Sequence, residues 1–145
     1  MRIAAIAIEM AFVLDASIAI AWLLPDEGSK ATDALVERLI TDTAFVPAIW
    51  PLEVINALFV AARRGRIPRT RIETLAEELI VYPITVESAS LKSCYIPAKL
   101  AARYKLTVYD ASYLELAQRR QLPLATLDNR LREACTKLNI TTLPE

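Results

Sequence analysis

The chain has 145 residues, 54% of them hydrophobic, and its 17 basic and 17 acidic side chains leave a formal charge of zero. This length suits one domain with a buried core, and the balanced charge means that any binding of nucleic acid must come from a local basic patch. The chain has two glycines and no histidine, which excludes a glycine-rich phosphate loop, a histidine-based triad and a zinc site that needs imidazole.

The N-terminal stretch over residues 3–24 is mostly apolar. Glu9 and Asp15 interrupt it, and no small-residue cleavage site follows, so neither a signal peptide nor a membrane span is expected. We interpret residues 1–9 as a short extension, either a lead-in strand or a tail, ahead of a domain that spans residues 10–145. The expected location of the protein is the cytoplasm.

The first elements alternate between strand and helix. The apolar run over residues 12–14 predicts a buried strand. Ser17 is expected to cap a short helix that Pro25 ends, and residues 26–41 are expected to form a second helix. A short strand over residues 44–46 follows.

The next helix, predicted over residues 48–64, is apolar almost all round. Up to residue 62 its only polar side chains are Glu53 and Asn56, and their i, i+3 spacing places them on one face. A carboxylate in such a helix is costly to bury unless a positive group meets it. Glu53 therefore stands out as a candidate functional residue.

The second half of the chain repeats the alternation. The expected elements are a helix that forms a hairpin with the preceding one, a strand at 84–86, a helix capped by Ser88 and kinked or split at Pro97, a helix from Asp110 to Gln121, a strand at 124–127, a last helix around 131–138 and a strand at 140–143. This pattern predicts an α/β fold, a single domain with a central parallel sheet of about four to five strands flanked by helices on both faces.

Four acids stand where this fold can bring them together. Asp15 and Asp128 follow predicted strands, Asp110 heads a helix and Glu53 interrupts one. Taken singly, the three aspartates are also ordinary turn or helix-cap residues, whereas capping does not explain Glu53. Because four carboxylates cannot converge without neutralisation, their meeting would require a hard divalent cation such as Mg²⁺ or Mn²⁺. Such ions promote attack of water on phosphodiesters.

Four short segments carry these acids: Val13-Leu14-Asp15-Ala16-Ser17, Leu52-Glu53-Val54-Ile55-Asn56-Ala57-Leu58, Tyr109-Asp110-Ala111-Ser112-Tyr113-Leu114 and Ala125-Thr126-Leu127-Asp128. In this order and at this chain length they resemble the PIN-domain family, and in particular the VapC-type toxin ribonucleases of toxin–antitoxin pairs. The resemblance runs from Met10 to the end of the chain. The interval 10–145 would then be a PIN-like nuclease domain.

The resemblance implies a metal-dependent endoribonuclease that hydrolyses RNA phosphodiester bonds as the toxin of a toxin–antitoxin system. Its cofactor would be Mg²⁺, with Mn²⁺ as a substitute, and it would form a homodimer silenced by a small cognate antitoxin. The family's motif assigns catalytic acids and metal ligands to four positions and supporting polar roles to three more: Asp15, Glu53, Asp110 and Asp128, then Ser17, Asn56 and Thr126. The last acidic position varies in the family.

Five arginines crowd the turn after residue 62, and three of them, Arg63, Arg64 and Arg66, are candidate contacts. They either bind RNA phosphates or an acidic antitoxin, or form a solvated turn beside a helix C-terminus. The aromatic residues in apolar helices favour packing in the core or a dimer interface over base stacking: Trp22, Trp50, Phe59 and Tyr113. Cys94 and Cys135 fall on apolar stripes, which favours buried thiols over a disulfide.

Two other interpretations of the acids were compared with the nuclease. One is a non-catalytic PIN-like binding or assembly domain, whose acids only cap helices, and Glu53 is the residue that separates the two hypotheses. The other is a phosphoryl-accepting receiver or haloacid-type phosphatase. That chemistry needs a second acid near the nucleophile, but Ala16 and Ser17 follow Asp15.

Overall fold

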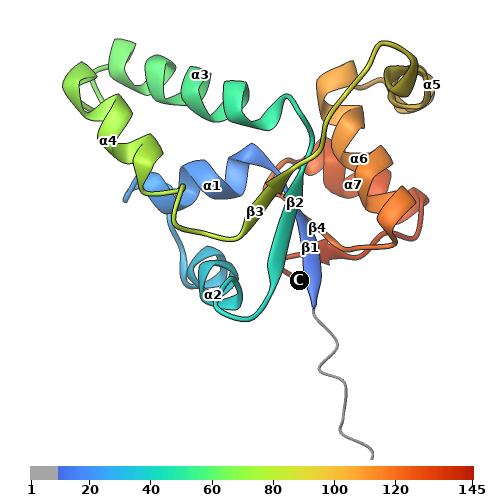
Figure 1. Ribbon diagram of the computed structural model, residues 1–145, viewed down its shortest axis with the longest axis horizontal. Helices are drawn as coiled ribbons and strands as arrows, with labels where there is room; N and C mark the ends of the chain where they lie inside the picture. Colours follow the sequence, from blue (N-terminus) through green and yellow to red (C-terminus); the bar gives the residue numbers. More distant parts are fainter. Residues whose placement is uncertain (1–9) are drawn as a thin grey trace, which may run out of the picture.

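The computed structural model describes residues 10–145 (Figure 1), so the predicted extension, residues 1–9, lies outside the described part. The helices and strands are β1 (Ala11–Leu14), α1 (Ala16–Leu23), α2 (Lys30–Arg38), β2 (Thr43–Val46), α3 (Trp50–Arg63), α4 (Ile72–Glu77), β3 (Ile84–Val86), α5 (Tyr95–Tyr104), α6 (Val108–Arg120), β4 (Leu124–Ala125), α7 (Asn129–Lys137) and β5 (Thr142–Leu143). Short 3₁₀ turns, η1 (Arg69–Arg71) and η2 (Lys92–Cys94), precede α4 and α5. Within residues 10–145, no helix has the length and apolar character needed to cross a membrane.

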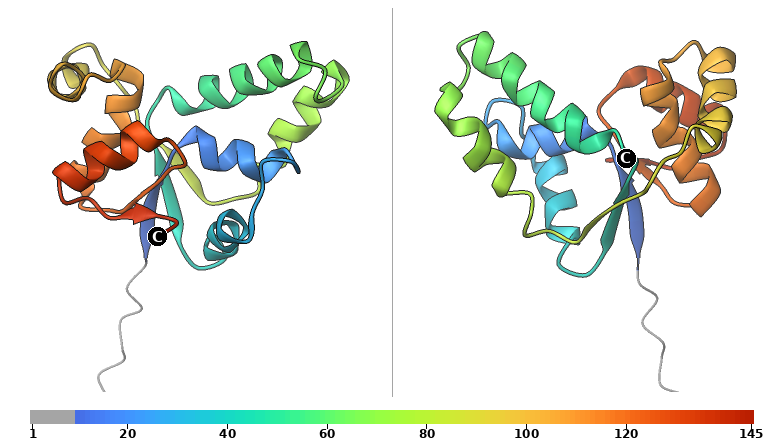
Figure 2. Two further views of the ribbon diagram at one scale, coloured as in Figure 1. Left: turned by 180° about the vertical axis from the view of Figure 1, so that it is seen from behind. Right: turned by 45° about the horizontal axis from the view of Figure 1, so that its top comes forward.

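The sheet has five parallel strands in the order β3-β2-β1-β4-β5. In Figures 1 and 2, α1 to α4 lie on one side of the sheet and α5 to α7 on the other. The central strand β1 is covered on both faces, so Phe12, Val13 and Leu14 are all fully buried. The predicted α/β fold with a parallel sheet and helices on both faces is confirmed.

The register of the central strands determines what meets at their carboxyl ends. β1 pairs with β4 so that Leu14 lies beside Ala125. The backbone N–H of Asp15 then donates to the Ala125 carbonyl at 2.9 Å. As a result the residues that follow the two strands, Asp15 and Thr126, lie next to each other.

Helix α3 projects beyond this end of the sheet and packs against α1 and α4. Its predicted hairpin with the following helix is confirmed, and Gly65 makes the turn in a left-handed conformation with φ of 73°. The core below it includes Val54 and Leu58 of α3, which are buried. Glu53 is carried on the same helix, one residue before the first of them.

Two predicted helix starts in the first half are wrong. Helix α2 begins at Lys30 rather than near Asp26, because Ser29 and Thr32 form a capping box in which each side chain accepts a hydrogen bond from the other residue's backbone N–H. Ser17 does not cap α1, because its hydroxyl donates to Asp15 instead.

In the second half of the chain, the starts of two helices and the end of one strand differ from the predictions. Ser90 and Ser93 exchange hydrogen bonds ahead of α5, so Ser88 is not the cap, and Pro97 lies in the first turn of α5 without splitting it. Thr107 caps α6, which places Asp110 inside its first turn. Strand β4 ends at residue 125, two residues earlier than predicted, and frees Thr126 for the site.

Candidate active site

Asp15 lies at the carboxyl end of the central strand, with 6% of its surface exposed. Its Oδ2 accepts two hydrogen bonds of 2.7 Å, one from the Ser17 hydroxyl and one from the Thr126 hydroxyl. Both donors use the same oxygen, so Oδ1 keeps its lone pairs free of any hydrogen bond within residues 10–145. Asp15 is therefore held firmly in one orientation with one oxygen available to a ligand.

The two hydroxyls that hold Asp15 are themselves fixed by the backbone after β4. Ser17 Oγ accepts from the N–H of Leu127 at 3.0 Å, and Thr126 Oγ1 accepts from the N–H of Asp128 at 3.0 Å. Each hydroxyl thus links a backbone donor to the buried carboxylate. The contacts place Ser17 and Thr126 where the resemblance puts supporting residues, and their part in activity stays a prediction.

Burial raises the pKa of Asp15 above its ordinary value of 3.8. The hydrogen bonds from Ser17 and Thr126 act in the opposite direction, and the negative charges of Asp110 and Asp128 raise the pKa further. The ionised form of Asp15 is therefore unfavourable in the metal-free protein. A cation would relieve this cost.

Glu53 is half-buried on α3, and its Oε1 accepts a 2.7 Å hydrogen bond from the hydroxyl of Tyr113 on α6. Burial is the main cause that raises its pKa, the bond from Tyr113 opposes that shift, and the charges of Asp15 and Asp110 add to it. Glu53 therefore lies within electrostatic reach of the acids after β1 and on α6, which is where the sequence-based hypothesis placed it.

Asp110 and Asp128 complete the group, and each lies at the start of a helix. Burial followed by the charge of Asp128 raises the pKa of Asp110, while the Thr107 hydroxyl and the positive charge of Arg130 lower it. Asp128 caps α7 by accepting from the N–H groups of Arg130 and Leu131 at 2.8 and 3.2 Å. The cap interpretation thus holds for Asp128, whose Oδ1 is already in use.

The electrostatic contacts bring all four predicted acids to one place, but not as a finished metal centre. Within residues 10–145 no three carboxylates or thiols stand close enough together to hold an ion directly. The donors still suit Mg²⁺ or Mn²⁺, because they are carboxylate oxygens and Mg²⁺ usually keeps several of its waters. The donor chemistry therefore fits a hydrated hard cation, and that Asp15, Glu53, Asp110 and Asp128 hold one stays a prediction.

A cavity of about 630 Å³ opens beside these acids, between α1 and α3. Its wall includes Glu53 and Asn56, which confirms that the two polar residues of α3 share a face, together with Ser17. Glu27, from the loop before α2, also lines it. Of the four acids Glu53 lines this cavity, and Ala16 and Ser17 bring its wall next to Asp15.

The arginines after α3 divide into free and paired side chains. Arg63 and Arg64 are exposed, whereas Arg66 donates to Asp26 at 2.7 Å and to Glu27 at 2.9 Å. These ion pairs tie the turn after α3 to the loop before α2. Arg66 could contact RNA or a partner only by giving up bonds that it already makes.

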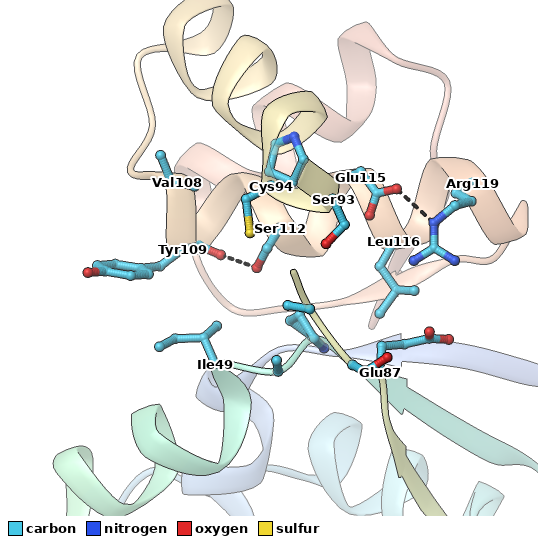
Figure 3. A pocket seen from close by; sticks show the side chains of 15 residues that line it. Ile49, Glu87, Ser93, Cys94, Val108, Tyr109, Ser112, Glu115, Leu116 and Arg119 are labelled. Atoms are coloured by element: carbon cyan, nitrogen blue, oxygen red, sulfur yellow. Dashed lines mark hydrogen bonds and ion pairs between the residues drawn. The ribbon is translucent and has the colours of Figure 1, made fainter. Parts of the chain in front are cut away.

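A second pocket, of about 310 Å³, lies between α5, α6 and the segment that leads into α3, and none of the four acids lines it. Figure 3 shows the side chains of α6 on one side of this pocket and Ile49 on the other. Its lining is mainly apolar, and the Glu115 carboxylate there is paired with Arg119 at 2.7 Å. It is smaller than the cavity lined by Glu53 and lies apart from the four acids.

The two cysteines are free thiols, as predicted, in different surroundings. Cys135 is buried on α7, and burial raises the pKa of its thiol to about 11, so the thiol stays neutral. Cys94 belongs to η2, is partly exposed and lines the second pocket. The prediction that Cys94 lies buried on a helical stripe is wrong.

Two residues of the site were missed by sequence reasoning. Tyr113 was assigned to packing, and it is indeed fully buried, but it also holds Glu53. Arg130 brings a positive charge to Asp110 from the first turn of α7. The i, i+3 spacing of Asp110 and Tyr113 on one helix was the available signal for the first, and the position of Arg130 two residues after Asp128 was the signal for the second.

Comparison with known proteins agrees with this fold. The PIN domain matches residues 12–137, and the chain belongs to the PIN domain family. Its relatives include "Ribonuclease VapC3" of Pyrobaculum aerophilum, 32% identical over 128 residues that cover 86% of this chain and 94% of that protein. The resemblance stated from the sequence is confirmed.

Solved structures share the fold at lower identity. PAE2754 from Pyrobaculum aerophilum has a TM-score of 0.68 at 22% identity, with 88% of this chain and 87% of that chain covered. A toxin–antitoxin complex from Klebsiella pneumoniae has a TM-score of 0.52 at 21% identity, with 81% and 86% covered. At these identities the similarity shows the fold alone.

Asp128 both caps α7 and adds a negative charge to the site, and two variants separate these roles. Asp128→Ala is expected to lower the stability of the protein by about 1 kcal/mol, because two backbone N–H groups of α7 lose their acceptor. Asp128→Asn keeps an acceptor and is expected to keep the stability. Both variants should lose less RNA cleavage than Asp15→Asn. Thermal melting and cleavage rates check this, and equal instability of the two Asp128 variants would contradict it.

Proposed function

We propose that this protein is a metal-dependent endoribonuclease that acts as the toxin of a toxin–antitoxin system. The observation that carries the proposal is the buried Asp15 carboxylate, held by the Ser17 and Thr126 hydroxyls and close enough to Glu53, Asp110 and Asp128 for their charges to interact. A capping role does not account for Glu53, which is held by a side chain from another helix. The relative named Ribonuclease VapC3 supports the same activity.

In the proposed reaction each residue of the chain has a definite task. A divalent cation, when bound, would lower the pKa of water and stabilise charge on the phosphodiester. Ser17 and Thr126 fix Asp15, and Tyr113 fixes Glu53, so both carboxylates would hold a cation without reorganising. The cavity between α1 and α3 admits the RNA backbone beside them, and Asn56 on its wall can donate a hydrogen bond to it.

The proposal is tested by cleavage of defined RNAs with Mg²⁺, with Mn²⁺ or with a chelator. Cleavage should require the metal, stop in the chelator and return when excess metal is added. The matched variants are Asp15→Asn, which should be inactive, and Asp33→Asn, an exposed acid on α2 that should cleave normally. Cleavage that continues in the chelator would contradict the metal dependence, and equal cleavage by both variants would contradict the role of Asp15. A folded protein that cleaves no RNA under any of these conditions would favour the non-catalytic binding domain.

Two protein partners belong to this proposal, a small cognate antitoxin and a second copy of the chain. A structure with this fold is described as a toxin–antitoxin complex, and the long apolar surface of α3 leaves Leu52 68% exposed and Ile55 and Phe59 each 36% exposed. Such surface is typical of an interface. A mass measurement that finds only the monomer at micromolar concentration would contradict the homodimer.

Arg63 and Arg64 are expected to contribute the phosphate contacts. If both neutralise a phosphate, their replacement by Ala should flatten the logarithmic salt dependence of single-stranded RNA binding by about 1.4. The matched control replaces Lys99 and Arg103, two exposed cations of α5, and should leave the slope unchanged. Binding is measured with Asp15→Asn as the background so that the RNA stays intact. An equal effect of both pairs would show that only net charge matters.

A further inference from the structure

Tyr113 connects the two helices that carry acids of the site. It is fully buried on α6, three residues after Asp110 and therefore on the same side of that helix. Its hydroxyl donates to Glu53 Oε1 of α3 at 2.7 Å. The backbone of Ala16, the residue after Asp15, also hydrogen-bonds to this phenol. Tyr113 thus links its own helix, which carries Asp110, to Glu53 on α3 and to the backbone beside Asp15.

We propose that Tyr113 is a positioning residue for the proposed nuclease, which orients the Glu53 carboxylate toward the cation by donating a hydrogen bond from its hydroxyl. The inference rests on the proposed function and adds a residue that the acidic motif does not contain. Glu53 has three side-chain torsions and sits half-buried on an otherwise apolar part of α3. Without a donor its carboxylate would occupy several rotamers, and only some of them would face Asp15.

The hydrogen bond has a directional consequence for Glu53. Oε1 is occupied by the phenol, and no hydrogen bond to Oε2 forms within residues 10–145. Since a buried phenol acts as donor to a carboxylate, the bond both satisfies the hydroxyl and fixes the plane of the carboxylate. Asp15 has the same arrangement, because the Ser17 and Thr126 hydroxyls both donate to its Oδ2 and leave its Oδ1 without a hydrogen bond within residues 10–145. Both acids are prepared in the same way for a shared ligand.

The alternative is that the Tyr113 hydroxyl merely satisfies itself and contributes stability. A double-mutant cycle of Tyr113→Phe and Glu53→Ala separates the two, with Mn²⁺ affinity from calorimetry as the readout. Positioning predicts that Tyr113→Phe weakens Mn²⁺ binding and cleavage by about 10-fold or more, as loss of the partner of a metal ligand does. In the Glu53→Ala background the same change should have no further effect on Mn²⁺ affinity.

The control is Tyr104→Phe on the neighbouring helix α5, whose ring packs near Arg103 and whose hydroxyl forms no hydrogen bond within residues 10–145. It should leave both Mn²⁺ affinity and cleavage unchanged. Wild-type affinity and cleavage in Tyr113→Phe would overturn the proposal, and so would an equal loss of Mn²⁺ affinity in the wild-type and Glu53→Ala backgrounds.

Failure of the nuclease function gives a different result. A wild-type protein that binds Mn²⁺ but cleaves no RNA overturns the proposed function and leaves the Tyr113 cycle measurable by affinity. A wild-type protein that binds no Mn²⁺ overturns both. Thermal melting of Tyr113→Phe accompanies the cycle. A folded variant whose loss of Mn²⁺ affinity disappears in the Glu53→Ala background supports the inference, whatever the size of its stability change.

Discussion

Replacing Asp15 with Asn is expected to abolish RNA cleavage and at the same time to raise the melting temperature of the metal-free protein. The side chain keeps its shape, and its carbonyl oxygen can still accept from Ser17 and Thr126. What disappears is a negative charge that is buried and faces the charges of Asp110 and Asp128. Loss of such a charge at the reacting centre should lower cleavage by about 100-fold or more.

The stability gain follows from the direction of the pKa shift of Asp15. Its pKa is higher in the folded protein than in the unfolded chain, mainly because of burial. Asp15 therefore favours the folded state below the ordinary value of 3.8, and this contribution is lost as the pH rises through the raised pKa. At pH 7 the ionised carboxylate destabilises the metal-free fold, and Asn removes that cost.

Melting in the presence of a chelator at pH 7 and near pH 4 measures this effect. For a chain of this size each kcal/mol gained raises Tm by about 2–4 °C, and the gain should shrink as the pH falls toward 4. Saturating Mn²⁺ should also reduce the difference, because it stabilises the wild type. Asp33→Asn, an exposed acid in the first turn of α2, should not raise Tm. A less stable Asp15→Asn at pH 7 would contradict the electrostatic account.

The sequence predicted the placement of the acids because local pattern and topology were enough for it. A short apolar run determines where β1 ends, and in a parallel sheet the ends of neighbouring strands share one edge, which brings Asp15 and Asp128 together. Glu53 was found because it is the acid that an apolar helix does not explain. The metal-binding role of these residues stays a prediction.

The predictions that failed involve contacts between distant segments or competition between neighbouring caps. Ser17 was expected to cap α1. Instead its hydroxyl accepts a hydrogen bond from the N–H of Leu127, 110 residues later, and donates one to Asp15. Tyr113 meets Glu53 across 60 residues, and nothing in either local segment specifies that distance. Helix α2 begins later than predicted because Ser29 and Thr32 form a reciprocal capping box, which competes with a start at Asp26.

The ion pairs of Arg66 are a surface example of a contact between distant segments that local sequence does not predict. Asp26 and Glu27 lie about 40 residues before Arg66 and come from a loop that the sequence assigned to a helix. Because that loop is irregular, its acids can reach the turn after α3. The predicted basic patch is therefore smaller than the count of arginines suggests, and Arg63 and Arg64 are its exposed members without an ion pair within residues 10–145.

Thr126→Val is expected to lower both cleavage and stability, in contrast to Asp15→Asn. The side chain of Thr126 is fully buried, and its hydroxyl donates to Asp15 Oδ2 while it accepts from the N–H of Asp128. Val has nearly the same shape but no hydroxyl, so the change leaves the partly buried N–H of Asp128 without its acceptor and the Asp15 carboxylate without one donor. The expected loss is about 1–3 kcal/mol of unfolding free energy.

The two expected losses of Thr126→Val have separate origins. Cleavage should fall by about 10-fold or more, because Asp15 is held by Ser17 alone. The bond from Thr126 lowers the pKa of Asp15, so its loss raises that pKa further, and the stability cost should be larger at pH 7 than at pH 4. Thr126→Ser keeps the hydroxyl and is the matched control, expected to restore most of the cleavage. If Thr126→Ser fails as badly as Thr126→Val, the methyl group and its packing, rather than the hydrogen bonds, hold Asp15 in place.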